Sequence, residues 1–347
     1  MLTPRSLLTP IALAASLAPA SGLVLDTRAD LSRFSAQPPA NVPANGGDQQ
    51  ASDPAPGAPS TSGGPDSMKP SAAITIPWRH TFRAKFDENR PGKVAIDRLG
   101  VDVNLRFPVN QQFSVGLSSG WEWSRYTFRD ATAFNAAFTK PWSDVHILSL
   151  GTSLNFATSD QTRWFVGAGV RSSGERGAEF GDTITVNGLA GGSYSFNENF
   201  TLGGCLVVSS RIEDNVQIIP ILIVDWKISD WLRFSTMRTR PGVRLTVTPA
   251  EWFSFGPEVS YESREFRLRD DKTNPGTRSS PGGVVRDRRL PVGAFAAFNF
   301  SRQFSLELSG GVELAQRYRF EDRQGNKVTG VETKPAGYLG LELSLRF

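Results

Sequence analysis

The chain ends in Gly337-Tyr338-Leu339-Gly340-Leu341-Glu342-Leu343-Ser344-Leu345-Arg346-Phe347, and this stretch decides the fold. Every second residue from Leu339 to Phe347 is apolar, and the residues between are glycine, glutamate, serine and arginine. This alternation is the pattern of a β-strand that has one apolar face and one polar face. Strands of soluble sandwiches usually have about 5–6 residues, whereas a tilted strand needs about 9–11 residues to cross a bilayer. The final segment therefore favours a membrane-spanning strand.

The same alternation recurs through the chain from about Thr75 onward. It is clear over 101–107, 113–117, 148–156 and 164–170, where the alternate positions are small, polar or charged. We predict strands near 75–86, 94–107, 112–127, 144–157, 163–172, 183–196, 200–210, 216–227, 231–239, 242–248, 252–266, 287–299, 303–319 and 332–347. These are fourteen strands, an even number as in single-chain bacterial barrels. The two segments around Arg240-Pro241-Gly242 are short, so twelve strands is the alternative count.

The connections between these segments alternate between tight and long. The tight ones include 108–111, 158–161 and 197–199, and aromatic residues stand close to either side of them. The long ones lie around 129–143, 171–182, 262–289 and 319–334. Short turns on one side, long loops on the other and an aromatic girdle are typical of outer-membrane barrels. Such a barrel must close, because an unpaired strand edge in hydrocarbon leaves backbone groups unsatisfied.

The N-terminal region has a different composition. Arg5, the apolar stretch up to Leu17 and the site Ala18-Pro19-Ala20 predict a secretory signal peptide over residues 1–20. Residues 21–74 are rich in Pro, Ala, Ser and Gly. Such a segment buries too little apolar surface to fold, so we expect a disordered periplasmic tail.

Taken together, the signal peptide, the unequal connections, the aromatic girdle and the final strand resemble the bacterial outer-membrane β-barrel class. The resemblance covers about residues 75–347, and it is closest to small barrel families without an assigned activity. It implies an all-β, closed antiparallel transmembrane barrel in the outer membrane, in contact with outer-membrane lipid and lipopolysaccharide. It also implies that the final strand, with Phe347 at its end, is the signal read by the barrel-assembly machinery.

Composition excludes several function classes. No apolar run is long enough for a membrane-spanning helix. Cys205 is the only cysteine, which excludes a disulfide framework or a cysteine-rich metal site. The net charge of +4, with acids interleaved among the bases, gives no nucleic-acid footprint. We therefore expect no cofactor, no metal and no nucleic-acid partner.

The two histidines do not fit the known hydrolytic barrels. Outer-membrane phospholipases and lipid A deacylases pair a histidine with a serine two residues later on the same strand face. Ser149 is three residues after His146 and faces the other way, and Phe82 stands two residues after His80. We find no acidic partner for either histidine, so the sequence predicts that the protein is not an enzyme.

Strand parity points a set of charged side chains into the lumen. These candidates are Arg79, Arg83, Arg98, Asp102, Arg106, Arg233, Arg244, Glu258, Glu262, Glu307, Glu342 and Arg346. Lys85 has the same parity. One interpretation is a charged constriction that selects small anions or zwitterions, and the other is a set of ion pairs that fills a narrow interior.

Two further features leave alternatives open. The segment 216–224 is apolar on both faces, which indicates either a wall for a hydrophobic solute or a local apolar core. The basic loop between Glu262 and Arg289 could pair with lipopolysaccharide phosphates or be a solvated loop. We predict a passive pore or transporter for small solutes. The alternatives are a structural or surface-exposed barrel with a filled lumen, an outer-membrane hydrolase and a soluble exported β-protein.

Overall fold

The computed structural model describes residues 69–87, 90–132, 134, 141–237, 241–270 and 282–347. The predicted signal peptide over 1–20 and most of the predicted tail over 21–74 lie outside these residues. The first strand begins at Ser71, four residues earlier than predicted. No helix in the described part of the chain is long and apolar enough to cross a membrane.

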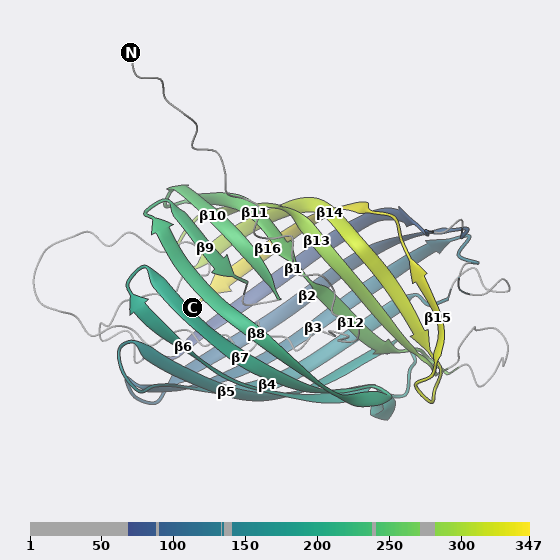
Figure 1. Cartoon of the computed structure of the whole chain (residues 1–347), viewed down its shortest axis with the longest axis horizontal. Helices are drawn as coiled ribbons and strands as arrows, with labels where there is room; N and C mark the ends of the chain where they lie inside the picture. Colours follow the sequence, from purple (N-terminus) through teal and green to yellow (C-terminus); the bar gives the residue numbers. More distant parts are fainter. Residues whose placement is uncertain (1–68, 88–89, 133, 135–140, 238–240, 271–281) are drawn as a thin grey trace, which may run out of the picture.

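The described residues form one antiparallel sheet that closes on itself (Figure 1). Its strands are β1 Ser71–Lys85, β2 Lys93–Pro108, β3 Phe113–Arg129, β4 Asp144–Ala157, β5 Thr162–Glu175, β6 Ile184–Asn197, β7 Phe200–Arg211, β8 Asp214–Ser229, β9 Leu232–Thr236, β10 Gly242–Ala250, β11 Phe253–Ser260, β12 Glu262–Arg267, β13 Val284–Asn299, β14 Phe304–Glu321, β15 Lys327–Glu332 and β16 Ala336–Arg346. A short 3₁₀ helix, η3 Phe180–Thr183, lies between β5 and β6.

Closure is made by the first and last strands. β1 pairs with β16 from Ala73 opposite Arg346 to Thr81 opposite Tyr338. β11 and β12 are two halves of one strand, since both pair with β13, and β15 and β16 both pair with β14. The barrel therefore has fourteen strands, which confirms the predicted count over the alternative of twelve. β9 and β10 are short, with 5 and 9 residues, as the sequence indicated.

The outer surface of the barrel is apolar. Large aliphatic side chains that alternate along the strands are exposed, among them Leu150, Leu206 and Leu339 at 60%, 54% and 52%. Aromatic side chains beside the tight turns are also exposed, including Trp164, Trp226 and Trp252. In water this surface would be an unusually large apolar patch, whereas in a bilayer it matches the hydrocarbon and the interfacial girdle.

The barrel is pinched at the end where β3 ends at Arg129 and β12 ends at Arg267, which we call the long-loop end. There Arg267 of β12 lies beside Gly174 of β5 in parallel register. The Ser173 hydroxyl donates to the Glu265 carbonyl at 2.6 Å, and the Arg269 amide donates to Glu175 Oε2 at 3.1 Å. Elsewhere in the barrel β6–β10 stand between β5 and the strand formed by β11 and β12. The contact therefore separates the interior at this end into two parts.

Candidate functional site in the barrel interior

Arg244 of β10 is the centre of one charged group, on the wall formed by β10, β11, β13 and β14. It donates to both carboxylate oxygens of Glu307 at 2.8 Å and to Glu258 Oε2 at 2.5 Å. Its guanidinium lies 3.8 Å from the centre of the Phe295 ring. A bidentate pair that is also stacked on a ring is held in one geometry. This group runs along the wall, between neighbouring strands.

Two other predicted lumen residues, Arg233 and Glu262, lie outside the Arg244 group. Arg233 donates from Nε to Asp225 Oδ1 at 2.6 Å on the neighbouring strand β8. Glu262 lies further toward the long-loop end and contacts other arginines. Glu307, another predicted lumen residue, belongs to the Arg244 group.

A second network crosses the interior near the long-loop end. Arg79 of β1 donates to Glu262 Oε1 of β12 at 2.6 Å, and Arg264 donates to Glu262 Oε2 at 2.8 Å. Arg264 also donates from Nε to Glu122 Oε1 of β3 at 2.9 Å. These contacts join β1 and β3 to β12 through side chains that are almost completely buried. Here the interior is filled by ion pairs.

Asp287 of β13 continues this network. It accepts from Tyr126 Oη at 2.8 Å and from Arg98 Nη2 at 3.3 Å, and it pairs with Arg289. Arg289 also donates to Glu313 Oε2 at 2.8 Å. The Asp287 and Arg289 side chains are both 0% exposed. Each charge has an opposite partner, as buried charges require.

An aromatic cluster covers this network at the long-loop end. Trp142 is 2% exposed, and its ring lies 4.6 Å from Phe128 and 5.4 Å from Tyr318, centre to centre. The cluster also contains Phe86, Tyr126, Phe134, Phe266 and Phe320. The sequence analysis placed Phe134 and Trp142 in the long connection around 129–143 and missed this cluster. The high density of large aromatic residues between Tyr126 and Trp142 could have indicated it.

In the other part of the interior, beside β5–β8, the β7–β8 turn lies at the long-loop end and contacts β12. Glu265 of β12 accepts from the Ile212 amide at 3.1 Å and from Arg211 Nε at 3.2 Å. Arg267 pairs with Glu213 in the same turn. The turn is thus attached to β12 by polar contacts. The other part of the interior is instead filled by packed aromatic rings at this end.

The inner wall of β6–β8 carries an apolar cluster. Leu189, Cys205, Val207 and Ile219 are buried together, and Phe165 and Ile221 pack against them. This placement confirms that the segment 216–224 has an apolar inner face. The cluster lines the β5–β8 side of the interior.

The remaining predicted charges lie as follows. Asp102, Arg106 and Glu342 are half-buried on inner-face positions, and Arg346 is exposed at the end of β16. Arg83 and Lys85 are exposed, contrary to the parity prediction, because the strand register shifts between Thr81 and Ala84. Thr81 and Ala84 take the inward places and are each 1% exposed. Phe347 is 71% exposed, and its backbone pairs with Ala72.

The histidines lie on the outer face. His80 Nδ1 is 2.6 Å from Asp97 Oδ1, which corrects the prediction that it has no acidic partner. It stacks near Trp78, and His146 stacks on Trp121 with ring centres 6.2 Å apart. Ser149 has the opposite parity to His146. Among the described residues no group of three or more His, Cys, Asp or Glu is placed to hold a metal ion.

Comparison with known proteins gives likenesses of structure alone. A scan against protein families found no match, and a search of curated proteins found none. An outer membrane channel from Pseudomonas putida F1 is similar at TM-score 0.44 and 12% identity, covering 80% of this chain and 95% of that one. A Pseudomonas aeruginosa FadL homologue is similar at TM-score 0.43 and 13% identity, covering 81% and 91%. The P. putida toluene transporter TodX is similar at TM-score 0.40 and 7% identity, covering 80% and 90%.

The class of the protein follows from its own geometry. The strands close without an end strand, the outer surface is apolar with aromatic residues beside the tight turns, and the inner surface holds the Arg244 group and the buried ion-pair network. These features define a bacterial outer-membrane β-barrel, as the sequence predicted, and they place the protein in the outer membrane.

Proposed function

We propose that this barrel conducts small solutes passively across the outer membrane, along the side of its interior that β5–β11 bound. The contrast in burial between the two sides carries the proposal. Tyr318 and Arg289 on the filled side are 0% and 1% exposed. On the β5–β8 side the apolar cluster is buried, but other inner-face residues, such as Gly169, Asn187 and Ile223, keep intermediate exposure. Side chains therefore fill one part of the interior and line the other.

The charged side chains inside the barrel do not by themselves favour solutes of one sign of charge. Arg244, Arg233 and Arg79 each have a carboxylate partner within 2.6–2.8 Å. Paired charges present a smaller net field to a passing ion than free charges do. We therefore propose that the charges mainly shape the interior, and that the route on the β5–β8 side is a neutral one with an apolar section.

We also propose that the protein has no catalytic activity. Both histidines lie on the outer face, where a solute in the lumen does not reach them. The His80–Asp97 pair has the rings of Trp78 and Phe82 beside it and no hydroxyl or thiol partner among the described residues.

Swelling of liposomes that contain the purified barrel tests conduction. We expect small sugars to enter faster than into empty liposomes. Ser209→Trp on the inner face beside the β7–β8 turn is expected to slow entry. Val208→Trp on the outer face of the same strand is the matched control and is expected to leave entry unchanged. Swelling no faster than that of empty liposomes would overturn the proposal.

The structural alternative is favoured by a specific observation, namely the ion-pair network and aromatic cluster that fill the long-loop end. A barrel of this kind would serve envelope integrity or attachment without transport. It predicts no swelling with the wild-type barrel and no difference between the two tryptophan variants.

A further inference from the structure

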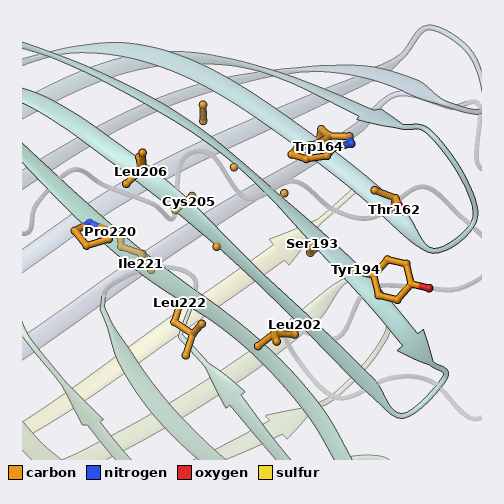
Figure 2. Close-up of a pocket in the computed structure, with 14 residues that line it drawn as sticks. Thr162, Trp164, Ser193, Tyr194, Leu202, Cys205, Leu206, Pro220, Ile221 and Leu222 are labelled. Atoms are coloured by element: carbon orange, nitrogen blue, oxygen red, sulfur yellow. The ribbon is translucent and has the colours of Figure 1, made fainter.

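A hollow of about 720 Å³ lies in the outer wall of the barrel, across β5–β8. Figure 2 shows Trp164, Tyr194, Leu202, Leu206 and Leu222 around it, on the strands that form the wall. We call it the wall groove. Its size falls in the range of small-molecule sites, about 300–1,000 Å³. It faces outward, and Cys205 and Ile221, whose side chains belong to the apolar cluster of the inner wall, also line it.

The wall groove exists because the outward positions at its floor have almost no side chain. Ala190, Gly192 and Gly204 stand there, between strands whose outward residues are large. A Cβ on Gly192 would lie 2.6 Å from Trp164 Cε3, so the indole rests over this glycine. The nearest atom to a Cβ on Gly204 is the Ile221 carbonyl oxygen at 3.5 Å, an ordinary contact. The backbone at Gly204 therefore tolerates a side chain, and the space above it is open.

The surroundings of the wall groove specify an apolar occupant. None of its fourteen lining residues is charged. Leu206 and Leu222 on its rim are 54% and 63% exposed, in the surface that faces hydrocarbon. Water there would lack hydrogen-bond partners, and an empty hollow would forfeit packing contacts. A flexible hydrocarbon chain needs no hydrogen-bond partner and can fill the hollow with packing contacts.

The position of the wall groove selects the leaflet. Thr162 and Tyr194 on its rim lie beside the tight turns at 158–161 and 197–199, and the Tyr194 hydroxyl donates to Gln161 Oε1 at 2.9 Å. Tight turns of outer-membrane barrels face the periplasm, and tyrosine at such a place sits at the level of lipid headgroups. The hydrocarbon that reaches the groove is thus an acyl chain of the periplasmic leaflet, which contains phospholipids.

We propose that the wall groove holds one acyl chain of a periplasmic-leaflet phospholipid as a resident lipid. The bound chain covers the thin, glycine-rich part of the wall and supports it from outside. This role is independent of solute conduction.

Native mass spectrometry tests the proposal on the full barrel, extracted from vesicles of phosphatidylethanolamine and phosphatidylglycerol. We expect the wild type to retain one phospholipid. Gly204→Phe fills the groove and is expected to lower the lipid-bound fraction at least tenfold, with Gly204→Leu intermediate. The matched control is Gly188→Phe on the outer face of β6, where the nearest atom to a Cβ is the Gly167 carbonyl oxygen at 3.7 Å. We expect this variant to retain the lipid.

Heat-modifiable migration in a detergent gel first establishes that each variant is folded. Equal lipid retention by Gly204→Phe, Gly188→Phe and the wild type would overturn the proposal, because the lipid would then be bound elsewhere or unspecifically. A wild-type dimer that Gly204→Phe dissociates would also overturn it and would assign the groove to a second copy of the chain.

Discussion

Replacement of Asp287 by alanine is expected to destabilise the barrel strongly. Asp287 is 0% exposed and partners Arg98, Arg289 and Tyr126. Its removal leaves Arg98 without the only acid to which its guanidinium is joined by an ion pair among the described residues. Removing one partner of a buried ion pair costs about 3–5 kcal/mol, because the remaining charge stays buried without compensation. This corresponds to about two to four orders of magnitude in the folding equilibrium.

Urea unfolding in vesicles, followed by tryptophan fluorescence, measures this loss. With a denaturant slope of about 3 kcal/mol per molar, the midpoint is expected to fall by about 1 M or more. Arg317→Ala is the matched control, since Arg317 and Glu332 form a pair whose side chains are 54% and 53% exposed, and an exposed pair contributes about 0–1 kcal/mol. The double variant Asp287→Ala/Arg98→Met is expected to recover part of the loss. A change below about 1 kcal/mol for Asp287→Ala would refute the account of the network.

Three other predictions concern the β7–β8 turn, the C-terminal residue and a glycine of β11. Glu265→Ala removes the two bonds that the Ile212 amide and Arg211 make to Glu265, leaves the Arg267–Glu213 pair in place, and is expected to raise the solute flux in liposome swelling; an unchanged flux would show that these two bonds do not limit passage. If Phe347 is part of the signal read by the barrel-assembly machinery, Phe347→Ala is expected to reduce the amount of assembled barrel in cells. The thermal unfolding of the refolded protein is expected to stay unchanged, because the side chain is exposed and only the backbone of Phe347 is paired. Gly256→Ala is expected to cost about 1–3 kcal/mol by overpacking against the Leu245 carbonyl, whereas Gly188→Ala is expected to be near neutral; equal unfolding midpoints would contradict this.

The alternation of residues was enough to predict the architecture, because the side-chain period of a strand is local. β4 occupies 144–157 as predicted, and most inward charges lie on the predicted face. The predicted orientation is wrong at Arg83, because a register shift between Thr81 and Ala84 exchanges the inward and outward positions. No pattern in the residues around Arg83 predicts that shift.

The contacts of the site were less accessible, because they depend on which strands meet across the interior. Glu262 shares one strand face with Glu258, yet it bonds Arg79 from the opposite wall. The pairing of β12 with β5 creates the pinch, and it joins residues that are 93 positions apart. The aromatic cluster brings together Trp142 from a long connection, Phe266 from β12 and Tyr318 from β14, which are far apart in the sequence. Such long-range packing leaves no periodic signature in the sequence.

Single-channel recording in a planar bilayer tests the central claim, a continuous passage on the β5–β11 side. The wild-type barrel is expected to give discrete conductance steps, which Ser209→Trp reduces and Val208→Trp leaves unchanged. Insertion of folded barrel with no conductance above that of the bare bilayer would contradict the claim, and it would establish a barrel whose interior is filled throughout.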